Sequence, residues 1–82
     1  MGFLGAYKQK SLIKKGNKFY KQRKYKEALE CYDKAQDLDL LNNLLVWWNK
    51  GIVFSKLKNY PNAIECYDKV LDLDPNHFAS LV

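Results

Sequence analysis

The sequence predicts an all-α fold built from two copies of a helix hairpin. The chain repeats itself with a period of 35: thirteen of the 25 residue pairs from Gly16–Gly51 to Leu40–Pro75 are identical. Apolar residues recur at helical spacing within each copy. Only two prolines and four glycines occur in 82 residues. A period of this length is typical of a supersecondary unit that stacks on a copy of itself.

The first unit predicts two helices separated by a polar turn. At about 100° per residue, the apolar residues of the first helix share one arc and its lysines share the opposite arc. The apolar arc consists of Leu12, Ile13, Gly16, Phe19 and Tyr20. The polar residues 22–24 break this pattern. A second helix is expected from about Tyr25 to Asp37.

The second unit predicts the same arrangement. One helix is expected from about Leu44 to Leu57, with a turn at residues 58–59. The next helix should begin near Tyr60, because Pro61 suits the first helical position, where its missing N–H costs nothing. It should end before residues 74–75, since proline does not continue a helix. Residues 76–82 are expected to start a further segment that caps the end only partly.

Composition excludes several classes of protein. The longest apolar run, residues 44–48, is far shorter than the roughly 20 residues that a bilayer span needs. The apolar N-terminal stretch is too short for a signal peptide. Two cysteines are too few for a secreted disulfide scaffold. Because Cys31 and Cys66 hold equivalent repeat positions, we expect buried, unbridged thiols. These features favour a cytoplasmic protein.

Charge is distributed unevenly along the chain. Residues 1–26 hold nine basic side chains and no acid, whereas residues 27–82 hold five basic and nine acidic ones, so that +9 and −4 give the net charge of +5. The basic block is either a solvated helix face or a surface for an acidic partner. For nucleic acid we expect only weak, salt-sensitive binding, because clustered cations contact phosphates without reading bases.

Candidate catalytic and metal-binding chemistry is sparse. The single histidine, His77, has no cluster of ligands at metal-binding spacing. The four glycines are scattered and form no phosphate-binding loop. The sequence therefore predicts no enzyme activity, no metal and no cofactor.

The repeated unit resembles the tetratricopeptide repeat. The second unit matches that pattern at Trp47, Gly51, Phe54, Ala63, Tyr67, Val70 and Pro75, and the first at Leu12, Gly16, Phe19, Ala28, Tyr32 and Ala35. Lys15 and Lys50 replace the family's leucine, and Leu40 replaces its proline. The resemblance covers residues 9–82. It implies a right-handed α-α superhelix in a single domain, residues 1–82, with repeats at about 9–43 and 44–78 and a partial cap at 76–82.

Two classes of position are expected to specify this fold and not a ligand. Small residues let the paired helices approach closely, at Gly16, Ala28, Gly51 and Ala63. Aromatic rings fill the space that this leaves, at Phe19, Tyr32, Phe54 and Tyr67.

The resemblance also implies a concave groove that binds peptides and is lined by the first helix of each repeat. By register, the groove positions are Lys10, Ile13, Asn17, Tyr20, Lys21, Leu45, Trp48, Asn49, Ile52 and Lys56. Chaperone-adaptor members of the family clamp a C-terminal carboxylate with Lys and Asn residues. Asn17 and Asn49 fall on two clamp positions, whereas Ile13 and Ala79 stand where such members have lysines.

Trp48 is an extra aromatic residue beside the family's Trp47. Adjacent side chains on a helix diverge by about 100°, so both rings cannot face one core. Trp48 is therefore predicted to point into the groove and to anchor a ligand together with Ile52. The alternative is that it packs on the next repeat or on residues 3–4.

Together these features predict a non-catalytic scaffold that binds a short peptide or helix of a partner protein, with acidic partners favoured by the lysines. One alternative is self-association, because two repeats leave an apolar end uncovered near Leu71 and Leu73. This alternative includes a homo-oligomer joined through the C-terminal end, or a fragment of a longer array. Another alternative is weak nucleic-acid binding through the basic first helix.

Overall fold

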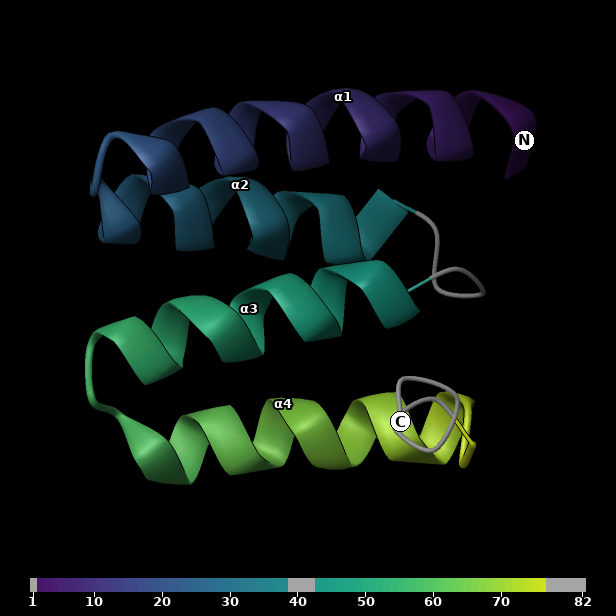
Figure 1. Ribbon diagram of the computed structural model, residues 1–82. Coiled ribbons are helices and arrows are strands. Elements are labelled where there is room, and N and C mark those ends of the chain that lie inside the picture. The colour runs from purple at the N-terminus through teal and green to yellow at the C-terminus, as the bar shows by residue number, and fades with distance from the viewer. Residues whose placement is uncertain (1, 39–42, 77–82) are drawn as a thin grey trace.

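Four helices make up the fold in the computed structural model, which describes residues 2–38 and 43–76, the side chains of residues 2–6 excepted. They are α1 (Gly2–Lys21), α2 (Tyr25–Leu38), α3 (Leu44–Lys56) and α4 (Tyr60–Leu73). The described ranges contain no strand. Helices α1 and α2 form one antiparallel hairpin, α3 and α4 form a second, and α2 lies against α3 (Figure 1). The predicted all-α architecture is confirmed.

Three of the four helices match their predicted bounds within one residue. The first helix differs, because α1 begins at Gly2, ahead of the predicted repeat start at residue 9. Residues 2–21 contain no proline, so the helix can extend from the repeat back toward the N-terminus as far as Gly2. Residues 77–82 of the predicted cap, which include His77 and Ala79, lie outside the described residues.

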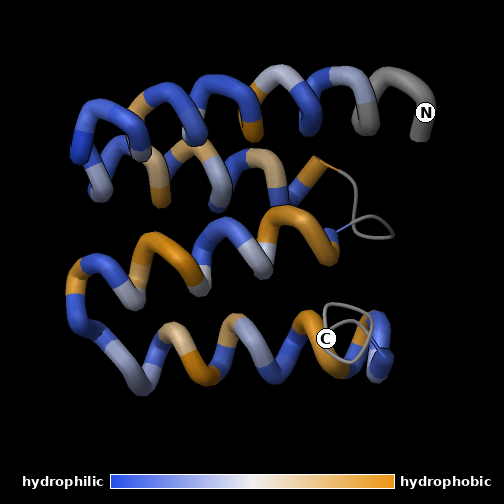
Figure 2. Tube along the Cα trace, viewed as in Figure 1, coloured by the Kyte–Doolittle hydropathy of each residue, from blue (hydrophilic) through white to orange (hydrophobic). Residues whose placement is uncertain are grey.

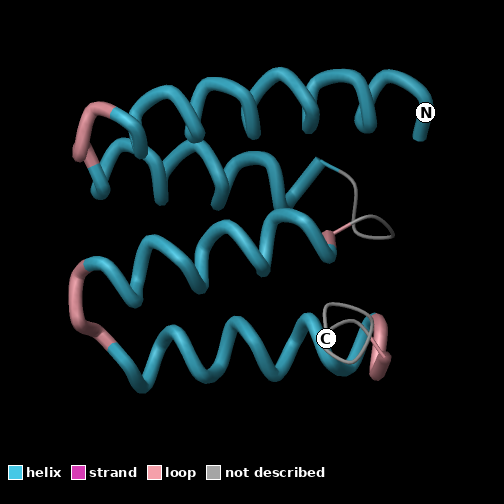
Figure 3. The backbone as a smooth tube through the Cα atoms, in the orientation of Figure 1, coloured by secondary structure: helices cyan, strands magenta, loops and turns pink. Residues whose placement is uncertain are grey.

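Both hairpin turns end the first helix in the same way. Arg23 and Lys58, which are 35 residues apart, have φ angles of 62° and 61°. The next N–H in each turn donates back five residues, from Lys24 to the carbonyl of Phe19 and from Asn59 to that of Phe54, both at 2.9 Å. A left-handed residue followed by such a bond closes the helix and satisfies its last carbonyls. The two turns lie at the same end of the hairpins (Figure 3).

The start of α4 follows the prediction. Pro61 occupies the first turn, and the Asn59 side-chain oxygen accepts a bond from the N–H of Asn62 at 3.5 Å. An asparagine before the helix and a proline just inside it are both favoured at helix N-termini. The helix stops ahead of Asp74, whose backbone is extended, because the residue before a proline disfavours helical geometry.

A close contact between a glycine and a tyrosine holds each hairpin together. A Cβ placed on Gly16 would lie 2.6 Å from a ring atom of Tyr32, and one on Gly51 would lie 2.5 Å from Tyr67. Only a residue without a Cβ lets the helices approach this closely, so the close approach expected at both glycines is confirmed. Around the first contact lies a buried apolar cluster that extends into α3, made of Ile13, Ala28, Tyr32, Ala35, Val46 and Val53. The tube in Figure 2 is mostly hydrophilic along α1 and carries longer hydrophobic stretches in α3.

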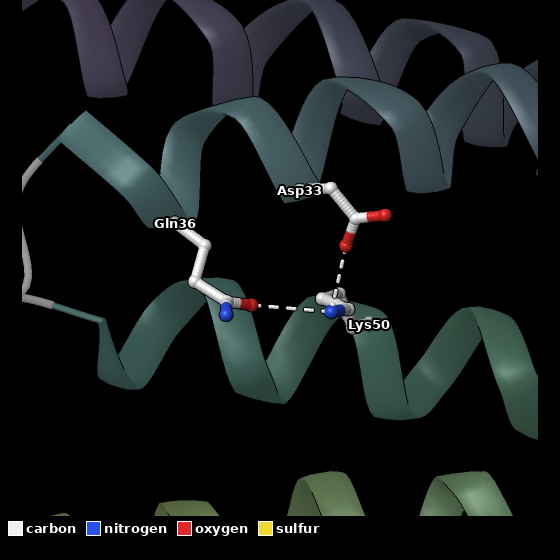
Figure 4. A network of polar contacts seen from close by, with 3 residues as sticks. All are labelled: Asp33, Gln36 and Lys50. Carbon is white, nitrogen blue, oxygen red and sulfur yellow. Dashed lines mark hydrogen bonds and ion pairs between the residues drawn. The ribbon is translucent and has the colours of Figure 1, made fainter.

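A lysine connects the two hairpins at the position where the family pattern has leucine. Lys50 of α3 forms an ion pair with Asp33 of α2, with 2.7 Å between Nζ and Oδ1. The same Nζ donates to Oε1 of Gln36 at 3.1 Å (Figure 4). It also lies 4.8 Å from the centre of the Trp47 ring. The Lys50 side chain is only 12% exposed, so these partners replace the hydration that the ammonium group loses.

A second polar link joins the hairpins near the start of α3. Gln9 is 4% exposed, and its Nε2 donates to the carbonyl of Ala35 at 3.1 Å and to Oδ1 of Asn43 at 3.2 Å. Asn43 precedes α3 and is 6% exposed. Buried amides are stable in a core only when they are bonded to partners of this kind.

We predict that Gly16→Ala destabilises the protein by about 2 kcal/mol, because the new methyl group overpacks the fully buried ring of Tyr32. The loss should occur although alanine is the better helix former by about 1 kcal/mol. Urea denaturation followed by circular dichroism measures it. Gly51→Ala is the matched variant and should cost less, since Tyr67 is only half-buried and can move. A stability gain in Gly16→Ala would contradict the packing constraint.

Candidate ligand pocket between the first three helices

A pocket of about 220 Å³ is lined by residues of three helices. Its lining consists of Asn17, Tyr20 and Lys21 from α1, Tyr32 from α2, and Asn49 and Ile52 from α3. The spacing of three or four residues within α1 and α3 places each group of side chains on one helix face. Five of these six residues belong to the predicted groove, and the structure brings them together around one hollow.

Asn17 lies at the centre of the polar contacts in this pocket. Its Oδ1 accepts a hydrogen bond from the hydroxyl of Tyr32 and a longer one, 3.4 Å, from Nδ2 of Asn49. One oxygen therefore connects α1 to both α2 and α3. With Oδ1 engaged in this way, the orientation of the Asn17 amide is fixed.

Burial, together with smaller contributions from the neighbouring Cys31 and Tyr20, raises the pKa of Tyr32 to about 12. The phenol is therefore protonated at neutral pH and acts as a donor toward Asn17. The Nδ2 of Asn17 then has no hydrogen-bond partner among the described residues. Every buried side-chain polar atom in that part of the chain has a partner. Since the Nδ2 of Asn17 has none, it is not buried, and this N–H group is accessible to a ligand.

The donor groups of the pocket suit an anion. Asn17 offers an N–H₂ group, Asn49 keeps a second N–H beyond the one it gives to Asn17, and Lys21 supplies an exposed positive charge. Tyr20 and Ile52 add apolar surface beside these donors. Amide and ammonium donors next to apolar walls can hold a carboxylate that is attached to an aliphatic side chain.

The remaining predicted groove residues lie elsewhere. Ile13 is 6% exposed and belongs to the apolar core. The other three besides Trp48 are exposed and do not line the pocket: Lys10, Leu45 and Lys56.

Trp48 packs within its own repeat. Its ring centre lies 5.4 Å from that of Tyr67 on α4, with the planes inclined by 53°. The side chain is half-buried and does not line the pocket. This contact was not anticipated from the sequence, because it joins two helices whose relative rotation no single helical period reveals.

Tyr32 is the pocket residue that the sequence analysis missed. The repeat pattern assigns the ring to packing alone, and the structure shows that the residue also lines the pocket and bonds to Asn17. Its repeat counterpart, Tyr67, instead has its hydroxyl 3.5 Å from that of Ser55. A signal for this difference exists in the sequence, since Asn17 in the first repeat corresponds to Ile52 in the second.

A second hollow of about 220 Å³ lies on the second hairpin, lined by Trp47, Lys50, Phe54, Asn62, Glu65 and Cys66. Burial raises the pKa of the Cys66 thiol, although the nearby Lys50 opposes this. A protonated thiol is a poor nucleophile. Cys31 and Cys66 are both buried and free, so the expected lack of a bridge is confirmed.

Two further properties of the described residues concern membranes and metal ions. None of the helices there has the length and apolar character needed to cross a bilayer. Residues 2–38 and 43–76 also hold no group of three or more His, Cys, Asp or Glu side chains arranged to bind a metal ion.

Residues 10–39 and 45–77 match the family model of the tetratricopeptide repeat. RNA polymerase II-associated protein 3 of Rattus norvegicus is 54% identical over 39 residues, and that of Homo sapiens is 51% identical over 39 residues. Each match covers 45% of this chain and 6% of the relative, so the shared segment is a small part of those proteins.

A solved structure has a similar fold over most of this chain. It is the first tetratricopeptide domain of Spaghetti (RPAP3) bound to the HSP90 peptide SRMEEVD, with a TM-score of 0.83 and 32% sequence identity. The alignment covers 88% of this chain and 56% of that one.

We predict that Tyr32 ionises near pH 12, above its ordinary value of 10.0. Because the folded-state pKa is the higher one, burial of the neutral phenol stabilises the fold fully below pH 10 and this contribution is lost as pH rises toward 12. The difference in phenolate absorbance between wild type and Tyr32→Phe, recorded against pH, measures it. Ionisation of Tyr32 at its ordinary pH in the folded protein would refute the assignment.

Proposed function

The chain belongs to the tetratricopeptide repeat family, and we propose that it is a non-catalytic interaction module that binds an acidic peptide segment of a partner protein. The observation that carries this proposal is the pocket in which Asn17 and Asn49 present amide donors between three helices. The similar domain of Spaghetti holds a peptide that ends in Glu-Glu-Val-Asp. That likeness supports a carboxylate-bearing ligand here.

The proposed binding mode uses the pocket and the helix faces beside it. Asn17 and Asn49 donate to a carboxylate, Lys21 and the exposed lysines Lys10 and Lys56 attract the acidic segment, and Ile52 contacts an apolar side chain. Leu45, exposed near the start of α3, adds apolar surface. In this mode Ile13 supports α1 from the core and does not touch the ligand.

A cytoplasmic location is part of the proposal. The buried, unbridged thiols of Cys31 and Cys66 support it, because thiols remain reduced in that compartment.

The first experiment uses the peptide SRMEEVD and its C-terminal amide as probes. We predict that the amide binds at least about tenfold more weakly, since hydrogen bonds to a charged group contribute about 1.5–3 kcal/mol. Asn17→Asp should abolish binding of the free acid. This variant keeps an oxygen for the Tyr32 hydroxyl but replaces the N–H₂ donor by a negative charge. Isothermal titration calorimetry measures all three affinities.

Matched variants separate the pocket from general charge and packing effects. Asn62→Asp introduces the same charge on the exposed start of α4 and should leave affinity unchanged. Tyr32→Phe should weaken binding because the Asn17 amide can then rotate, whereas Tyr67→Phe should not. Equal affinities for the acid and the amide, with Asn17→Asp still active, would mean that this pocket does not read a carboxylate.

Trp48 gives a separate prediction about the apolar part of the ligand. If its half-exposed ring anchors the peptide beside Ile52, Trp48→Ala weakens SRMEEVD binding by about 2 kcal/mol. Tyr60→Ala, which removes another exposed ring of the same hairpin, serves as the control. Unchanged affinity in a folded Trp48→Ala protein would limit Trp48 to its contact with Tyr67.

A further inference from the structure

The contact between α2 and α3 shows how one hairpin of this chain packs against the next. On the α2 side it is formed by Asp33 and Gln36, which hold Lys50 of α3. Leu29, also on α2, is packed against the shared core. Figure 4 shows both polar side chains directed from α2 toward the lysine. The surface therefore combines an acid, an amide and an aliphatic side chain along one helix face.

The same face recurs on α4, 35 residues later, where no described residue covers it. Ile64 corresponds to Leu29 and is 59% exposed, and Leu71 corresponds to Gln36 and is 37% exposed. Asp68 corresponds to Asp33, is exposed, and takes part in no ion pair within the described part of the chain. Two large aliphatic side chains at such exposure flank an unpaired carboxylate, which is typical of a contact surface.

The complementary half of this contact lies on α1. Lys15 occupies the repeat position of Lys50, is exposed, and pairs with no acid among the described residues. Leu12, the counterpart of Trp47, lies one turn before it. The chain thus carries a receiving face on α4, formed by Ile64, Asp68 and Leu71, and an inserting face on α1, formed by Leu12 and Lys15. The counterparts of these two faces, on α2 and α3, meet within one molecule.

We propose that a second copy of this chain docks its α1 on α4 of the first, with Lys15 of one copy paired to Asp68 of the other as Lys50 is paired to Asp33. This surface is separate from the peptide pocket and does not depend on the proposed function. The occupant is a second copy because the charges match: residues 1–26 carry nine basic groups and no acid, and residues 27–82 a net −4. Opposite charges on the two faces favour head-to-tail encounter over other arrangements.

The proposed contact is heterologous, because different surfaces of the two copies meet. Such a contact leaves one free α1 and one free α4 on every assembly, so it extends into a chain of copies and does not close as a symmetric dimer. Since an exposed ion pair contributes little by itself, association rests largely on burial of Ile64 and Leu71. We expect association that strengthens with protein concentration and weakens with salt.

Two charge reversals test the pairing by sedimentation velocity over a concentration series. Lys15→Glu places two carboxylates opposite each other at the junction, and Asp68→Lys places two ammonium groups there. Each variant alone should raise the dissociation constant by at least about tenfold. A mixture of the two should recover association, because the reversed α1 of one variant then meets the reversed α4 of the other and opposite charges are restored at that junction.

Control variants change the same charges outside the contact. Lys14→Glu matches Lys15→Glu in charge, but its repeat counterpart Asn49 lines the peptide pocket and not the α2 face. Asp72→Lys matches Asp68→Lys, and its counterpart Asp37 stays exposed although α3 covers α2. Both controls should associate like wild type, and circular dichroism confirms that all variants remain helical.

Four results would overturn the proposal. A wild-type protein that sediments as a single copy at every concentration excludes the contact. Association that stops at two copies points to a closed, symmetric interface instead. A mixture of Lys15→Glu and Asp68→Lys that fails to recover association would show that these two residues do not pair. Controls as impaired as the test variants would show that overall charge and not this pair governs association.

Discussion

The contact between a helix glycine and the tyrosine of the following helix determines both the packing of this protein and the chemistry of its pocket. Gly16 and Gly51 lack the Cβ that would collide with Tyr32 and Tyr67, so each pair of helices closes onto an aromatic ring. In the first hairpin this closure carries the Tyr32 hydroxyl to the Asn17 side chain. In the second it carries the Tyr67 hydroxyl to Ser55. One steric constraint thus gives two different surroundings, depending on which polar residue the first helix offers.

The contact between the two hairpins differs in kind from the contacts within each hairpin. Within a hairpin, small residues and rings pack closely, whereas between hairpins a mostly buried lysine reaches an acid and an amide on the preceding helix. Lys50 carries four methylene groups that cover apolar surface, and only its ammonium group requires polar partners. A lysine at a leucine position therefore keeps much of the packing and adds a directional requirement that a leucine does not impose.

The sequence was sufficient to predict most of the fold and part of the pocket. The second to fourth helices and both turns follow from a repeated pattern in which apolar spacing and turn residues agree. The early start of α1 was missed because residues 2–8 precede the repeat register. Asn17, Tyr20, Lys21, Asn49 and Ile52 could be grouped because register fixes the helix faces. Tyr32 and the Trp48–Tyr67 contact could not, since they depend on how two helices are rotated against each other.

The buried bond between Gln9 and Asn43 has a consequence for how such a chain can be rearranged. The two repeats are similar in sequence, yet the position of Gln9 holds Leu44 in the second repeat, and that of Asn43 holds Phe78. An amide pair and an apolar pair at equivalent repeat positions cannot substitute for each other, because a buried amide without a partner is costly. The order of the modules is therefore encoded at their boundaries. Duplicating or exchanging whole repeats during evolution would preserve each hairpin but would require compensating changes in the residues that connect one repeat to the next.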